Sequence, residues 1–121
     1  MHLLFVYGTL KRGCKNHAHM AGQSLVADAR SVGGHRLYDL GDYPGLVPDP
    51  TEPDGVIGEI WSVDAAALRR LDDFEGVDEG LYARRPIKLR PPHDTLAVDT
   101  YVFLGRVDGR PRIGPEWRES A

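Results

Sequence analysis

The hydrophobic and polar positions of the chain follow two periodicities, which predict several strands and one clear helix. Apolar runs that are continuous or alternating, and rich in β-branched and aromatic residues, are typical of strands. The segment 14–23 could hold one short helical turn, and the Gly-, Pro- and Asp-rich segment 41–54 is predicted to be a loop. The predicted strands are residues 2–7, 24–31, 34–39, 55–63, 81–90 and 96–104.

The helical signal begins at Asp64, a favourable N-cap residue that strong helix formers follow, and runs to Phe74. Gly76 fits the left-handed conformation that often ends a helix. Strands and helices do not alternate regularly, so a doubly wound sheet is not expected. We predict instead an α+β domain, a small mixed β-barrel of about six strands with one main flanking helix. It would be a single domain over residues 1–121, with an irregular tail after about residue 105.

Glu75 stands out on this helix because its position continues the apolar stripe of Leu68 and Leu71. A carboxylate on the buried side is costly. Desolvation and the negative end of the helix dipole would raise its pKa toward the range of a general base. The helix could instead fray before Gly76 and release Glu75 into water, and the periodicity leaves both readings open. The charged residues expected on the outer side are Arg69, Arg70, Asp72 and Asp73.

The loop after the first strand, Tyr7-Gly8-Thr9-Leu10-Lys11-Arg12-Gly13, is a second candidate site. Gly8 lets the backbone approach a ligand closely, and the N–H groups of such a turn can bind a carboxylate. Lys11 and Arg12 would add positive potential. The alternative is an ordinary turn that ends a strand. A phosphate-binding loop is not expected, because the residues after Gly13 are not the required Lys followed by Ser or Thr.

Other polar residues give weaker signals. Cys14, His17 and His19 are too few to predict a metal site and lack the partners of a cysteine nucleophile. The turn at Tyr43 could place that ring at a pocket rim or be a plain turn. Tyr82 and Arg84 share one strand face, from which they could hydrogen-bond toward Glu75 or simply lie at the sheet edge.

Composition narrows the partners and the location. The chain has 121 residues, a formal net charge of -3 and a pI of about 5.9, which argues against nucleic acid or an anionic membrane as partner. No apolar run approaches the roughly 20 residues of a membrane helix. The N-terminus lacks the features of a signal peptide, and the single cysteine gives no sign of an oxidising compartment. We therefore expect a cytoplasmic protein; the oligomeric state stays open.

Taken in order, these segments resemble the γ-glutamylcyclotransferase-like (AIG2-like) family, and most closely its γ-glutamylamine cyclotransferase branch. The resemblance spans about residues 2 to 104. The segments that carry it are Val6-Tyr7-Gly8-Thr9-Leu10-Lys11-Arg12-Gly13, Tyr43-Pro44-Gly45, Gly58-Glu59-Ile60-Trp61, Leu71-Asp72-Asp73-Phe74-Glu75-Gly76, Tyr82-Ala83-Arg84 and Thr100-Tyr101-Val102-Phe103.

The resemblance implies a small mixed β-barrel and a small-molecule γ-glutamyl substrate, which cyclises to 5-oxoproline and releases an amine without a metal or organic cofactor. Glu75 matches the family's catalytic glutamate. The loop that holds the glutamyl group matches Tyr7, Gly8, Thr9 and Leu10, and we add Tyr82 to the predicted substrate-binding residues.

Two alternatives to this enzyme remain. One is a non-catalytic module that binds a small carboxylate on the same fold, and the other is a tailoring enzyme that removes γ-glutamyl groups from larger amines. Asp78 and Glu79, in the loop after the helix, could favour a cationic leaving group such as lysine or could be solvated.

Overall fold

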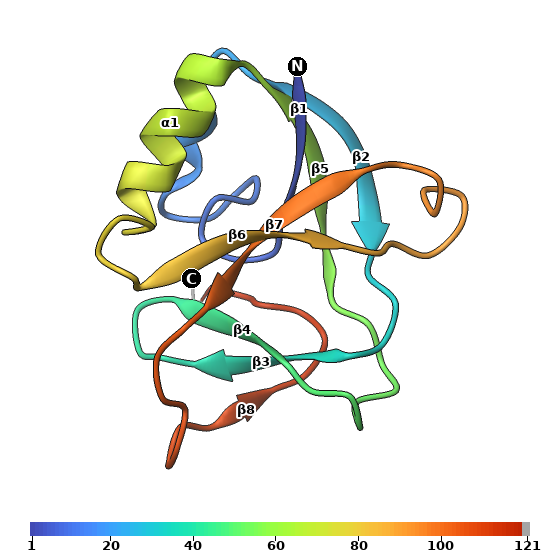
Figure 1. The fold of residues 1–121 in the computed structure, drawn as a ribbon, viewed down its shortest axis with the longest axis vertical. Helices are drawn as coiled ribbons and strands as arrows, with labels where there is room; N and C mark the ends of the chain where they lie inside the picture. The colour runs from blue at the N-terminus through green and yellow to red at the C-terminus, as the bar shows by residue number, and fades with distance from the viewer. Residues whose placement is uncertain (120–121) are drawn as a thin grey trace.

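Two β-sheets and one α-helix make up the fold in a computed structural model that describes residues 1–119 (Figure 1). The larger sheet has the strand order β2-β5-β1-β7-β6 and the smaller one β4-β3-β8. In chain order the elements are β1 (His2–Val6), the 3-10 helix η1 (His17–Met20), β2 (Ser24–Arg30), β3 (His35–Asp39), β4 (Pro44–Pro48), β5 (Ile57–Val63), α1 (Ala65–Phe74), β6 (Tyr82–Ile87), β7 (Val98–Phe103) and β8 (Arg112–Ile113).

The predicted fold class is confirmed: the protein is α+β, with a mixed sheet and one main helix. The larger sheet is mixed because β1 runs parallel to β7, with Leu4 opposite Asp99, while its other neighbouring strands are antiparallel. The predicted pairing of segments 81–90 and 96–104 is observed as β6 and β7, with Tyr82 opposite Phe103.

Two strands were missed by the sequence analysis. Segment 41–54 was predicted to be a loop, but it contains β4, whose two prolines lie at its ends and at the edge of a sheet, where a missing N–H is tolerated. Leu46, in the middle of β4, is fully buried. The tail expected to be irregular contains the two-residue strand β8, in which Ile113 pairs with Leu37 of β3. β8, with two residues, is too short to show an alternation, and in β4 two prolines and a glycine among five residues read as a loop.

After the exposed His2, strand β1 is apolar, and from Leu4 on it is buried on both faces. Leu4 and Val6 belong to a cluster that includes the inner face of α1, whereas Phe5 and Tyr7 point into a second cluster with Leu37 and other residues of the smaller sheet. A strand covered on both faces loses the polar alternation of a half-exposed one. Its carboxyl end therefore emerges between the two layers.

Helix α1 is fixed at both ends as the sequence predicted. The Asp64 carboxylate accepts a hydrogen bond from the backbone N–H of Ala67 at 2.7 Å, and Gly76 has the expected positive φ of 70°. Glu75 donates its own N–H to the carbonyl of Leu71 at 2.9 Å, so the alternative of fraying before Gly76 is wrong. Within residues 1–119, no helix has the length and apolar character needed to cross a membrane.

Candidate active site

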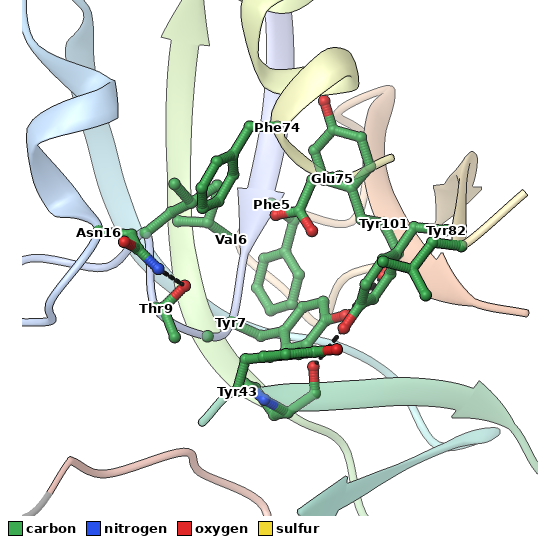
Figure 2. Close-up of a pocket in the computed structure, with 14 residues that line it drawn as sticks. Phe5, Val6, Tyr7, Thr9, Asn16, Tyr43, Phe74, Glu75, Tyr82 and Tyr101 are labelled. Carbon is green, nitrogen blue, oxygen red and sulfur yellow. Dashed lines mark hydrogen bonds between the residues drawn. The ribbon is translucent and has the colours of Figure 1, made fainter. Parts of the chain in front are cut away.

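A cavity of about 250 Å³ lies where the end of α1, the loop after β1 and strands β6 and β7 meet (Figure 2). It gathers residues that are far apart in the sequence, and most of its walls are apolar or aromatic. All five predicted site residues outside the helix border it together with Glu75. Its lining residues are Phe5, Val6, Tyr7, Gly8, Thr9, Leu10, Asn16, Tyr43, Pro44, Phe74, Glu75, Leu81, Tyr82 and Tyr101.

Glu75 extends from the C-terminal end of α1 into this cavity (Figure 2). Its side chain is partly buried, and within residues 1–119 its carboxylate accepts no hydrogen bond and pairs with no cation. Loss of solvent around the carboxylate raises the pKa of Glu75 from its ordinary 4.5 to about 7. A carboxyl group with this pKa can both take up and release a proton near neutral pH.

The loop across the cavity presents backbone N–H groups. In the part of the chain that the structure describes, the N–H groups of Gly8, Thr9 and Leu10 donate to no other protein group. The loop is held by other bonds: Lys11 donates its N–H to the Gly8 carbonyl at 3.2 Å, and Asn16 bonds Thr9 through both its backbone and its side chain. Free N–H groups on a firmly held turn are suited to bind an anion or a developing oxyanion.

Gly8 is required at its position by a close approach of two segments. A Cβ atom added to Gly8 would lie 2.8 Å from the Cγ atom of Pro44 at the start of β4. The sequence-based reason for a glycine here was the approach of a ligand, and the structure adds a second reason, the approach of the neighbouring strand.

The basic residues of the loop do not line the cavity, contrary to the expectation that they would add positive potential there. Lys11 is buried, and its ammonium group donates to the carbonyl of Trp117 at 2.7 Å. Arg12 pairs with Glu59 and Asp28. Both basic side chains are thus bonded to β2, β5 or the C-terminal segment. These tertiary contacts could not be predicted from local sequence.

Glu59 of β5 holds the loop in place. One of its carboxylate oxygens accepts from the backbone N–H of Arg12 and from the indole of Trp61, both at 3.1 Å, and the other accepts from Arg12 Nε at 3.0 Å. The sequence analysis quoted Glu59 within a motif but gave it no role. The signal available in the sequence was a charged residue among the apolar positions of a strand, which indicates a buried carboxylate with bonding partners.

Three buried tyrosines support the wall of the cavity. Tyr7 donates its hydroxyl to the carbonyl of Tyr101 at 2.6 Å, and Tyr82 donates to the carbonyl of Pro44 at 2.8 Å. Burial, and with it the nearby Glu75 charge, raises the pKa of both Tyr7 and Tyr82. Neither hydroxyl bonds Glu75, so the hydrogen bond considered for Tyr82 is not formed. Tyr82 begins β6 at the edge of the larger sheet, as the alternative had it, but its ring is buried, lines the cavity and is bonded to β4.

Asp72 was expected on the outer side of the helix, and that expectation is wrong. Its carboxylate accepts from the Tyr101 hydroxyl at 2.7 Å and from Arg84 Nε at 3.0 Å, and Arg84 also bonds Asp99. Arg84 is therefore turned to this network rather than to Glu75. Because Tyr101 also lines the cavity, the network fixes one wall of the site to the last turn of α1.

The remaining candidates lie around the site or away from it. Tyr43, which could have been a plain turn residue, does line the cavity and is 38% exposed. Cys14, His17 and His19 are not among the lining residues, and within residues 1–119 there is no group of three or more His, Cys, Asp or Glu residues placed to hold a metal ion. The sequence analysis gave no site role to Asn16, Phe74, Leu81 or Tyr101, which carry no catalytic signature of their own.

Comparison with known proteins gives consistent matches over nearly the whole chain. A family model described as "Gamma-glutamyl cyclotransferase, AIG2-like" matches residues 4–119. The human gamma-glutamylaminecyclotransferase is 34% identical over 138 residues, which covers 98% of this chain and 85% of the human protein. A solved structure of an AIG2-like protein from mouse has a TM-score of 0.83 at 29% identity, covering 95% of this chain and 87% of that one.

A plant relative is longer than this chain. A gamma-glutamylcyclotransferase-like protein of Arabidopsis thaliana is 39% identical over 94 residues, which covers 72% of this chain but 50% of that protein. The chain thus matches about half the length of this relative.

Proposed function

Because this chain belongs to the gamma-glutamyl cyclotransferase, AIG2-like family, we propose that it cyclises a γ-glutamyl amide to 5-oxoproline and releases an amine. Glu75 is the proton-transferring residue of this proposal. The backbone of Gly8, Thr9 and Leu10 binds the glutamyl group, and Tyr7 and Tyr82 form the wall against which it lies.

The proposed reaction needs one group that accepts a proton from the attacking nitrogen and gives it to the departing nitrogen. The substrate's α-ammonium group cannot attack until it loses a proton, which Glu75 accepts. The free α-nitrogen then forms a bond to the γ-carbonyl carbon of the same molecule, closing the five-membered ring. The carbon–nitrogen bond of the amide breaks as Glu75 returns the proton to the departing nitrogen. The ring nitrogen loses its second proton through the same carboxylate to the released amine, which leaves as an ammonium ion. No water or other reactant is consumed.

One observation carries the proposal: across a single cavity, a carboxylate faces a turn, and within residues 1–119 neither the carboxylate nor the N–H groups of the turn have a protein partner. The raised pKa of Glu75 suits the base, since a carboxyl group of ordinary pKa would accept a proton from an ammonium group only at a large cost in free energy. The N–H groups suit the substrate's α-carboxylate or the oxyanion of the tetrahedral intermediate, and fixing the substrate there favours ring closure.

The finer part of the proposal concerns the leaving group. We propose that the substrate is the γ-glutamyl amide of an amine and not a γ-glutamyl peptide, from which the α-nitrogen of an amino acid would depart. The support for this part is the similarity to the human protein named gamma-glutamylaminecyclotransferase, and to a rat protein of the same name that is 42% identical over 94 residues.

The decisive experiment measures release of 5-oxoproline from a panel of γ-glutamyl amides by the wild type and by Glu75→Gln. We expect the glutamine variant to lose about a thousandfold in kcat/KM, the usual scale for removing a general base. Glu79→Gln is a matched control, because Glu79 is an exposed acid in the next loop that does not line the cavity. Equal activity of wild type and Glu75→Gln would exclude the role given to Glu75.

The same panel separates the other candidates. Binding of γ-glutamyl compounds without release of 5-oxoproline would favour the carboxylate-binding module. Turnover restricted to large acylated amines would favour the tailoring enzyme.

A further inference from the structure

The mouth of the cavity differs in character from its floor. The floor is closed by buried residues such as Phe5, Tyr7 and Tyr101, whereas the exposed side chains at the opening are Tyr43, Phe74 and Leu81. These three are 38%, 41% and 40% exposed, and they are among the large hydrophobic residues that the protein leaves in contact with solvent. Large apolar side chains gathered at the rim of a cavity are typical of a ligand-binding surface.

The rim determines what the departing amine touches. With the glutamyl group bound between Glu75 and the loop, the amide's other substituent cannot continue through the closed floor and must leave past the rim. It therefore lies against Tyr43, Phe74 and Leu81.

Among residues 1–119, the lining of the cavity offers no free charged group to bind a charged amine. Glu75 is the one charged side chain that lines the cavity in the described part of the chain, and it is committed to proton transfer. The ammonium group of Lys11 and the guanidinium of Arg12 are bonded to other partners. Asp78 and Glu79, the acids considered for a lysine leaving group, are exposed and do not line the cavity.

We propose that this site prefers γ-glutamyl amides whose departing amine carries an uncharged, apolar chain, with Tyr43, Phe74 and Leu81 as the residues that set the preference. The inference rests on the proposed function. A carboxylate or ammonium group placed against this rim loses hydration without gaining a partner. Each methylene group that the rim removes from water favours binding about fourfold.

A matched series of three substrates tests the preference. The γ-glutamyl amides of n-pentylamine, 1,5-diaminopentane and 6-aminohexanoate have similar chain lengths and end in a methyl, an ammonium and a carboxylate group. We expect kcat/KM for 5-oxoproline release to be about tenfold higher for the pentylamide than for either charged compound, within the range that an apolar pocket can discriminate. Ratios within threefold, or a charged compound as the best substrate, would overturn the inference and leave the proposed function intact.

Leu81 offers variants that assign the preference to the rim. Leu81→Gln should bring the pentylamide close to the charged compounds, and Leu81→Glu should make the diaminopentane derivative the best of the three. Comparing substrates within one variant cancels any change in Glu75 itself. Leu104→Gln is the control, because Leu104 is a nearby exposed leucine outside the cavity, and it should leave all ratios unchanged. Unchanged ratios in both Leu81 variants would contradict the role of the rim, whereas no 5-oxoproline from any amide would overturn the proposed function as well.

Discussion

Two glutamates adjoin the loop after β1, and they differ in what surrounds their carboxylates. Glu59 is 7% exposed and accepts three hydrogen bonds, two of them from Arg12. Glu75 faces the same loop across the cavity and accepts none within residues 1–119. The first carboxylate has its desolvation offset by donors and fixes the loop. The second bears that cost without compensation, so it remains free to act on a ligand.

This contrast shows how a buried acid in a strand or helix can be assigned. Burial alone does not separate a structural carboxylate from a reactive one, because both residues are withdrawn from water. The number of donors separates them, and three experiments can test the distinction.

The largest effect is expected in the pH dependence of the wild type. Because Glu75 must be ionised to accept a proton and has a pKa of about 7, it is half ionised at pH 7, and kcat/KM should fall about 50-fold from pH 7 to pH 5. Initial rates of 5-oxoproline release across this range measure it. The residual activity of Glu75→Gln should follow the fraction of substrate whose α-amine is unprotonated and show no inflection near 7, and a wild-type inflection near 4.5 would contradict the reactive role.

The second-largest effect is expected in stability, which Glu75→Gln and Glu59→Gln should change in opposite directions. Below pH 4.5 Glu75 is protonated in both the folded and the unfolded chain. Between about 4.5 and 7 the unfolded chain loses the proton first, so the wild-type free energy of unfolding falls as pH rises, relative to that of Glu75→Gln. At pH 8 we expect Glu75→Gln to be more stable by about 2 kcal/mol, allowing for the partial exposure of the side chain.

Glu59→Gln should instead be less stable than wild type by about 2 kcal/mol, because its amide NH₂ group would meet donors where an oxygen now accepts. Urea unfolding of both variants at pH 4 and pH 8 gives the comparison. Destabilisation by Glu75→Gln at pH 8 would mean that Glu75 has partners in solution and that the contrast with Glu59 fails.

The smallest of the three effects concerns the loop itself. In Gly8→Ala the new methyl group would meet Pro44 at 2.8 Å, and one of the two segments must shift. We expect kcat/KM to fall about tenfold through displacement of the N–H groups, a scale consistent with sub-ångström misplacement of a bound substrate. Gly114→Ala is the control, since a Cβ there meets nothing within 4 Å. Unaltered kinetics in Gly8→Ala would show that the loop need not hold this position for turnover.

Much of this site was predictable because its signals are local. The i, i+3 and i+7 spacing of Leu68, Leu71 and Glu75 made an inward carboxylate one of two readings, and Gly76 marked where the helix would end. Asp72, three residues before Glu75, was placed wrongly by the same reasoning. Its position on the helix does not reveal that Arg84 and Tyr101 approach it from β6 and β7.

By itself, the sequence determined the helix and its caps and the first buried strand with its glycine loop, since each depends on residues a few positions apart; it offered the inward direction of Glu75 as one of two readings. Only the tertiary structure decided which charged side chains are bonded to a partner. Lys11 finds its acceptor 106 residues away and Arg12 finds Glu59 47 residues away, while nothing within residues 1–119 reaches Glu75. A carboxylate's reactivity depends on the presence or absence of such partners, and that is fixed by how distant segments pack together.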